Sequence, residues 1–261
     1  QASELVGSPQ DCGGLYFPQA GWVRPAQLCQ TLLQHPQIRV HIKEVTGLQR
    51  VDDSWRLQFA DGNDHDSPQV VIANASAAPR LIEPALLPVK SIRGQISLLD
   101  ARGLPDIKTV LCGHAYMAPA LDGQMVIGAT YHQNDPCEEI RNSDHMANIE
   151  HLLEFGPEFQ ACQSSVDIVG GRTSFRCTTP DYLPMAGSLP DRSLFIQTYQ
   201  NIASNARKIP TMSAPCHPGL WINIGHGSRG LASAPLCAEI IAADISGSGR
   251  PVSDTICEAI W

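Results

Sequence analysis

The chain has 261 residues, of which 43% are hydrophobic and 17% charged, and it carries a net charge of −8. These values are typical of an ordinary globular protein with one large or two small domains, and no apolar run approaches the ~20 residues of a membrane span. A nucleic-acid-binding protein usually shows a basic patch, and this sequence has no run of Lys or Arg, so an RNA substrate would need most of its phosphate contacts from another part of the protein.

Cysteine and histidine usage argues against a metal site. The nine cysteines include no Cys-x-x-Cys pair, and their odd number argues against a full disulfide framework. We therefore expect buried free thiols in a reducing cytoplasm. The nine histidines form no His-Glu-x-x-His motif or comparable ligand cluster, so the sequence predicts no bound metal.

The first third of the chain predicts a short helix and a small antiparallel meander. Gly13–Trp22 is glycine-rich and aromatic, which suits a strand and loop at a ligand cleft, and Pro25 begins a helix. Alternating apolar and polar residues predict half-buried strands at 38–43 and 55–59. A β-branched run at 69–73 predicts a buried strand that follows the meander.

A second region follows Pro88. Its predicted elements are, in order, a strand at 90–99, hairpin strands at 115–119 and 125–129, a helix capped by Ser143, a strand at 166–170 and a segment at 194–197. An irregular loop is expected from about 199 to 218.

The stretch Leu220–Ile245 predicts a strand, a glycine turn and a helix. Leu220–Ile224 is a short apolar run, Gly225–Gly230 contains three glycines, and Ser233 is placed to cap the helix. The N-terminus of such a helix suits a phosphate or a cofactor atom that becomes negative, although a tight connection that binds nothing fits the spacing equally well. The nucleophile elbow Gly-x-Ser-x-Gly is not satisfied around Ser228, which disfavours a serine hydrolase.

Three motifs, taken in this order, resemble the D-amino-acid-oxidase-like superfamily of FAD-dependent amine oxidoreductases. They are Tyr116–Pro119 with Gly123–Thr130, then Arg176–Gly187, then Gly225–Ala234. Within the superfamily the chain is most similar to the oxidoreductase domains of bifunctional enzymes that modify the wobble uridine of bacterial tRNA. The closer match is carried by Gly13–Pro18, Gly21-Trp22, Gly128–His132, Arg176-Cys177, Leu183–Met185 and Gly227–Glu239.

The resemblance implies an α+β fold in which an α/β remnant of the FAD domain accompanies a substrate domain with a mixed or antiparallel sheet. Residues 1–85 would form the later part of the FAD domain with its meander, 86–198 the substrate domain, and 199–261 the loop and C-terminal strand, turn and helix of the FAD domain. The superfamily's FAD domain begins with a strand, a Gly-x-Gly-x-x-Gly turn and an acidic residue for the ribose, none of which we identify in this chain. We therefore expect a fragment that lacks the N-terminal FAD-binding and methyltransferase regions and binds FAD poorly or not at all.

The resemblance also implies site residues. Arg176 would grip a substrate carboxylate through two parallel hydrogen bonds, Tyr116 would orient the same carboxylate, and Gln95 would lie near the flavin. An ordinary salt bridge, simple packing and an exposed strand position are the respective alternatives. The implied FAD contacts are Val45, Asn74, Ala75, Gly227, Ser228, Arg229, Gly230 and Leu231.

The implied reaction is FAD-dependent oxidation of the secondary amine of 5-carboxymethylaminomethyl-(2-thio)uridine at the tRNA wobble position, which gives aminomethyl-uridine and glyoxylate. The absence of a basic patch favours an alternative substrate, a small free amine such as glycine, sarcosine or a D-amino acid. A further alternative is a non-catalytic fragment that awaits a dinucleotide-binding partner.

Overall fold

The computed structural model describes residues 1–82, 87–200 and 213–260, so most of the expected loop at 199–218 lies outside the described residues. They divide into two compact units, one of residues 1–38 and 92–175 and the other of residues 39–91 and 176–261. Within these residues, every helix is too short or too polar to cross a membrane.

The first unit is built on a six-stranded sheet in the order β10-β5-β8-β7-β6, with β9 also pairing with β5. Its strands are β5 (Lys90–Asp100), β6 (Leu111–Cys112), β7 (Tyr116–Met117), β8 (Gln124–Gly128), β9 (His132–Gln133) and β10 (Ile168–Thr178). Its helices are α1 (Ala2–Val6), α2 (Pro25–Leu33), α3 (Asn142–Leu152) and α4 (Pro157–Ala161), with the short 3-10 helices η3 (Leu153–Phe155) and η4 (Gln163–Ser165). The first residues of β5 and the last of β10 belong to the second unit.

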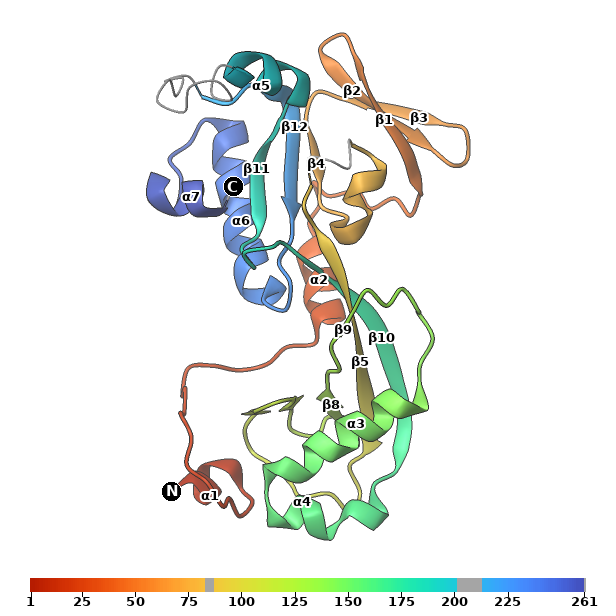
Figure 1. The fold of residues 1–261 in the computed structure, drawn as a ribbon, viewed down its shortest axis with the longest axis vertical. Coiled ribbons are helices and arrows are strands. Elements are labelled where there is room, and N and C mark those ends of the chain that lie inside the picture. Colours follow the sequence, from red (N-terminus) through yellow and green to blue (C-terminus); the bar gives the residue numbers. More distant parts are fainter. Residues whose placement is uncertain (83–86, 201–212, 261) are drawn as a thin grey trace. The chain divides into compact units, whose positions relative to one another are not determined.

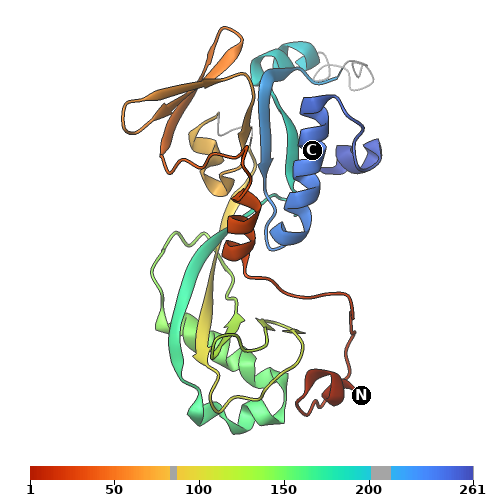
Figure 2. The same ribbon diagram turned by 180° about the vertical axis from the view of Figure 1, so that it is seen from behind.

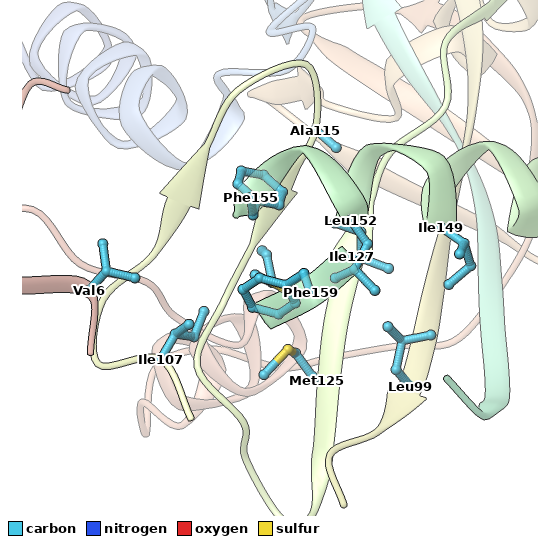
Figure 3. Packing of buried hydrophobic residues seen from close by; sticks show 11 residues of the cluster. Val6, Leu99, Ile107, Ala115, Met125, Ile127, Ile149, Leu152, Phe155 and Phe159 are labelled. Atoms are coloured by element: carbon cyan, nitrogen blue, oxygen red, sulfur yellow. The ribbon is translucent and has the colours of Figure 1, made fainter. Parts of the chain in front are cut away.

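One apolar core holds this unit together. In Figure 1, α3 lies across the sheet beside β5 and β8. Side chains alternate between the two faces of a strand, so Met125 and Ile127 of β8 both enter the core, where they meet Leu152 of α3 and Phe159 of α4 (Figure 3). Burial of each such side chain contributes about 1.5–3 kcal/mol relative to exposure.

The second unit contains a meander and a separate three-stranded sheet. The meander pairs β1, β2 and β3 in sequence order, and the other sheet has the order β11-β12-β4. The strands are β1 (Val45–Val51), β2 (Ser54–Phe59), β3 (Asp64–Ser67), β4 (Val70–Ile72), β11 (Met185–Pro190) and β12 (Cys216–Ile224). The helices are α5 (Arg192–Tyr199), α6 (Gly230–Ser246) and α7 (Asp254–Ile260), with the 3-10 helix η1 (Ala75–Arg80). In Figure 2, α6 runs alongside β11 and β12, against which it packs.

This mixture of helices and sheets confirms the α+β class, and most predicted elements are present. The predicted strand at 38–43 is wrong, because regular strand structure begins only at Val45 and the side chains of Ile38, Val40 and Ile42 are exposed. A period-two pattern specifies a strand only where another strand pairs with it. Ser143 is not a helix cap, since α3 begins at Asn142 and its N-cap is Arg141.

Candidate cofactor and substrate site

Two of the predicted cofactor segments leave one sheet at the same edge. β4 and β12 pair in parallel, with Ile72 opposite Ile222. The carboxyl ends of the two strands therefore lie side by side, and the chain continues from them into Asn74-Ala75 and into Gly225–Gly230 respectively. In open sheets with parallel strands, ligands bind outside these ends, so this edge is the candidate cofactor site of the second unit.

The end of β10 joins the same edge. Thr178 forms a bridge with His226, and the Gly227 amide donates a hydrogen bond of 2.7 Å to the Cys177 carbonyl. Burial raises the pKa of the Cys177 thiol, and interactions with the Ser76 hydroxyl and the Gly225 backbone partly oppose that rise. The segments that follow β4 and β12 thus both lie close to the last residues of β10.

The turn after β12 requires glycine at two positions. Gly225 and Gly227 have φ of +80° and +55°, in the left-handed region. A Cβ on Gly225 would also lie 2.8 Å from the Cγ2 atom of Thr179. At Gly230 the nearest atom to an added Cβ is the Cβ of His226, at 3.6 Å, which is ordinary contact. A side chain at position 225 or 227 would therefore strain the turn, whereas a Cβ atom at position 230 would fit without a clash.

The expectation that the chain contains no Gly-x-Gly-x-x-Gly turn is wrong in its literal form, because Gly225, Gly227 and Gly230 have this spacing, after a strand and at the start of a helix. The dinucleotide fingerprint also needs a βαβ unit and a third glycine for close packing of helix and strand. Here α6 is followed by α7 rather than by a parallel strand. The turn therefore has the glycine spacing of a dinucleotide-binding turn but lacks the βαβ unit and the close packing at the third glycine.

The N-terminus of α6 is open to a ligand. Its N-cap is Arg229, no side chain caps it, and its first turn carries no acidic residue. Ser228 and Arg229 are exposed, as is Leu231. Helix N-termini carry unsatisfied N–H groups and partial positive charge, so the residues present fit an electron-rich part of a cofactor. Ser233, predicted as the cap, instead lies within the helix, with its hydroxyl 3.1 Å from the Arg229 carbonyl oxygen.

His226 secures this turn, and sequence reasoning gave it no role. Its Nδ1 lies 2.9 Å from Oγ of Ser233 in α6, and its Nε2 lies 2.9 Å from Oδ1 of Asn223 in β12. Burial lowers the pKa of the His226 imidazole, which keeps it neutral at neutral pH. In the neutral ring Nε2 donates to the Asn223 amide oxygen and Nδ1 accepts from the Ser233 hydroxyl, so the imidazole links the strand to the helix across the turn. Its place between two glycines of a strand–turn–helix was the available signal.

The remaining predicted cofactor residues lie at two different sheets: Asn74 and Ala75 follow β4, and Val45 begins β1 of the meander. Ala75 has φ of +52° and Asn74 is the N-cap of η1, and both are exposed beside the edge described above. Val45 begins β1 and pairs with Phe59 in the meander, a different sheet from that of the glycine turn. The assignment of all these residues to FAD stays a prediction.

The two predicted carboxylate-binding residues belong to different units. Arg176 is half-buried on β10 and directly precedes Cys177, whose carbonyl binds the glycine turn. Tyr116 lies on β7, where it pairs with Cys112 and Gly128, and 41% of it is exposed. That both residues hold one carboxylate stays a prediction.

Gln95 is fully buried on β5. Its Nε2 donates to the Arg141 carbonyl at 2.8 Å, and the Arg141 amide donates to its Oε1 at 2.8 Å. These contacts fix the chain at the start of α3 and favour a structural role, because the amide is already paired. The predicted position near the flavin stays untested.

The thiols are less uniform than expected. All nine cysteines are free, as predicted, but only Cys177, Cys237 and Cys257 are buried, while Cys12, Cys29 and Cys112 are exposed.

Comparison with known proteins identifies the family. The model of the family DAO, FAD dependent oxidoreductase, matches residues 1–244. The chain belongs to this family. The predicted resemblance is thereby confirmed, as are the oxidoreductase class and FAD as the cofactor of the family.

Curated relatives are similar over almost the whole chain. The chain is 39% identical over 254 residues to the tRNA 5-methylaminomethyl-2-thiouridine biosynthesis bifunctional protein MnmC of Pseudomonas syringae pv. tomato, covering 95% of this chain and 38% of that protein. The MnmC protein of Chromohalobacter salexigens is 38% identical over 260 residues, covering 96% of this chain and 37% of that protein. The chain thus spans less than two fifths of the length of these relatives.

Solved structures of amino-acid and amine oxidases share the fold. Glycine oxidase from Geobacillus kaustophilus superposes with a TM-score of 0.63 and 20% identity, over 81% of this chain and 50% of that one. Iminodiacetate oxidase from Chelativorans sp. gives a TM-score of 0.60 and 19% identity, over 82% of this chain and 51% of that one. The D-amino-acid-oxidase-like fold is therefore confirmed.

Proposed function

We propose that this chain contributes the oxidoreductase part of a bifunctional tRNA-modifying protein. Its reaction is oxidation of the secondary amine of 5-carboxymethylaminomethyl-(2-thio)uridine at the wobble position. The bond between the amine nitrogen and the carbon beside the carboxylate is oxidised to an imine, with loss of two electrons and two protons, for which bound FAD would be the acceptor. Hydrolysis of the imine gives glyoxylate and aminomethyl-uridine.

The observation that most supports this proposal is the 39% identity with an MnmC protein over 95% of the chain, combined with the open N-terminus of α6 beside β10. The fold is equally compatible with oxidation of other amines, whereas similarity over almost the full chain favours the tRNA substrate named for these relatives.

FAD, when bound, supplies the two-electron acceptor. The residues of this chain bind and orient the cofactor and the substrate. The amides at the N-terminus of α6 (Gly230 and Leu231) stabilise negative charge on the cofactor, and His226 holds them in place. Arg176 binds the carboxylate of the substrate arm through charge-assisted hydrogen bonds, and Tyr116 orients it.

The other requirements fall to the remainder of the protein. The net charge of −8 makes this chain a poor binder of tRNA phosphates on its own, so we assign most tRNA contacts, the missing FAD-binding segments and the methyltransferase to regions outside this chain. Residues 39–91 and 176–261 would then serve the cofactor and, through Arg176, the substrate carboxylate, and residues 92–175 would serve the rest of the substrate, in the cytoplasm where tRNA is modified.

A second candidate is oxidation of a small free amine by the same chemistry. The negative net charge favours it, and the similar folds include glycine oxidase and iminodiacetate oxidase. Arg176 would then bind the carboxylate of an amino acid.

The test begins with the purified chain and added FAD, followed by absorbance in the flavin bands. The flavin-loaded protein is then given tRNA that carries the carboxymethylaminomethyl group, glycine or sarcosine, with glyoxylate and the modified nucleoside as readouts. Turnover of tRNA alone supports the first proposal, and turnover of glycine or sarcosine alone replaces it with the second. A protein that takes up no flavin is non-catalytic by itself.

A further inference from the structure

A cluster of metal-binding side chains lies in the first unit, whereas every residue assigned to the cofactor belongs to the second unit. It consists of His114, His151 and Glu154, whose ligand atoms all lie within 4.8 Å of one another. The sequence predicts no metal because these residues form no short motif: His114 and Glu154 are 40 positions apart. The fold brings them together. His114 lies between β6 and β7, His151 lies in the last turn of α3, and Glu154 lies in η3, which follows α3 directly.

The two histidines converge on one carboxylate. Nδ1 of His114 lies 2.8 Å from Oε2 of Glu154, and Nδ1 of His151 lies 3.1 Å from Oε1 of the same residue. The imidazole rings are 5.9 Å apart. Both oxygens of the Glu154 carboxylate thus face an imidazole nitrogen, so the three side chains present their ligand atoms to a common space.

The backbone that carries each ligand is anchored by the core. Ala115, Leu152 and Phe155, the immediate neighbours of the three ligands, are all buried in the cluster drawn in Figure 3. The ligand side chains themselves remain accessible, with His114 80% and Glu154 47% exposed. An ion can therefore enter from solvent without rearrangement of the core.

We propose that His114, His151 and Glu154 form a binding site for a divalent transition-metal ion, of which zinc is the best match. Two imidazole nitrogens and one carboxylate oxygen are typical zinc ligands, and three protein ligands leave a fourth tetrahedral position for water. Softer sites would contain a thiolate, and sites for magnesium or calcium would consist of oxygen alone. A bound ion would take the place of the hydrogen bond in each Nδ1···Oε contact.

The bound ion would connect two parts of the first unit that are distant in sequence. His114 is two residues before Tyr116, so the ion ties the β6–β7 turn that carries Tyr116 to the end of α3. The metal site does not depend on the proposed function. Its effect on catalysis does, because it acts through Tyr116.

The test uses the untagged chain and titrates it with Zn²⁺ by calorimetry and with Co²⁺ by NMR of the histidine ring protons. We expect one saturable site and paramagnetic shifts of His114 and His151 at substoichiometric Co²⁺. The H114N, H151N and E154Q variants should each weaken zinc binding by at least about tenfold. Even the loss of a residue that only supports a metal ligand lowers metal affinity by about 10–100-fold.

The H41N variant is the matched control, because His41 is exposed and lies outside the cluster. It should bind zinc like the wild type. All variants retain the same nine thiols, so zinc bound by cysteines contributes equally to each. Absence of saturable binding, Co²⁺ shifts centred on other histidines, or unchanged affinity in the cluster variants would each overturn the proposal.

Discussion

Arg93 is a fully buried charge whose polar contacts organise the first unit. Its guanidinium pairs with the buried Asp144 carboxylate and donates to the carbonyls of Cys137 and Glu139, both at 2.7 Å. A buried ion pair gives little net stability compared with an apolar pair, but removal of one partner leaves an uncompensated charge. The sequence offered no sign of this arrangement, because an arginine within a strand pattern is normally exposed.

We therefore expect Asp144→Asn to lower the free energy of unfolding by about 3 kcal/mol, as for other broken buried pairs. Urea unfolding of the two proteins measures the difference. Asp66→Asn is the control, because the Asp66 pair with Arg56 lies at the surface and such pairs contribute no more than about 1 kcal/mol. Equal losses in the two variants would contradict the importance of the buried pair.

The same carboxylate predicts a pH dependence. Burial alone would raise the pKa of Asp144, but hydrogen bonds from Arg93 and His132 outweigh it and the pKa is lowered. A carboxyl whose pKa is lower in the folded state than in the unfolded state stabilises the protein at any pH above its unfolded-state pKa, about 3.9. This contribution is lost as the pH falls through the folded-state pKa. Unfolding free energies measured from pH 7 downward should decrease below about pH 4 less steeply in Asp144→Asn than in the wild type; parallel curves would contradict it.

Arg176 is the residue whose assignment depends most on the proposed function. Charge-assisted hydrogen bonds are worth about 1.5–3 kcal/mol each, so loss of two of them in Arg176→Ala should reduce kcat/KM for the carboxylate substrate by at least about 100-fold while flavin uptake is preserved. Arg172→Ala is the matched control, because Arg172 is an exposed arginine four residues earlier on β10. Similar kinetics of the two variants would remove Arg176 from the substrate site.

The strand, turn and helix of β12 and α6 show which elements sequence can specify. Local chemistry is sufficient here, because an apolar run and glycines at fixed positions determine the strand and the turn. The helix boundary was placed too late, since Ser233 looks like a cap in the sequence but its hydroxyl bonds within the helix and to His226. That choice depends on a buried imidazole, which only the fold positions.

We expect His226→Ala to loosen this turn. The variant loses two hydrogen bonds worth about 1 kcal/mol each, so amide exchange of Gly227–Leu231 should accelerate by about tenfold or more. Mass-spectrometric hydrogen exchange measures this without any cofactor. Ser246→Ala, at the other end of α6, should leave exchange in the turn unchanged. Flavin affinity should fall in His226→Ala alone, and unaltered exchange in that variant would refute the positioning role.

At the scale of the whole molecule, the sequence alone predicted the strands but not which distant segments come together. The meander and the paired strands followed from alternation and turn residues, and β4, β5, β8 and β12 lie close to their predicted positions. The grouping of residues 1–38 with residues 92–175 in one compact unit was not among the features that the sequence predicted, and the predicted domain boundaries stay predictions. Such groupings depend on contacts between distant segments, and the metal-binding cluster was missed for the same reason.

A final feature of the chain is an apolar segment without a core. Between residues 15 and 42, ten large hydrophobic side chains are exposed, and α2 has no buried residue although it is amphipathic. Exposed apolar surface of this extent marks an interaction site or a tendency to associate.

The isolated chain should therefore bind a hydrophobic dye and self-associate, because apolar surface left in water favours contact with other apolar surface. A triple variant with serine at Leu15 and Phe17 and glutamine at Leu32 should lose most of the dye fluorescence and sediment mainly as a monomer. Serine at Ile140 and Ile196, two exposed apolar residues outside the segment, should have little effect. Dye fluorescence and analytical ultracentrifugation decide the matter: a wild-type chain that is monomeric and free of dye would show that the segment is covered in solution.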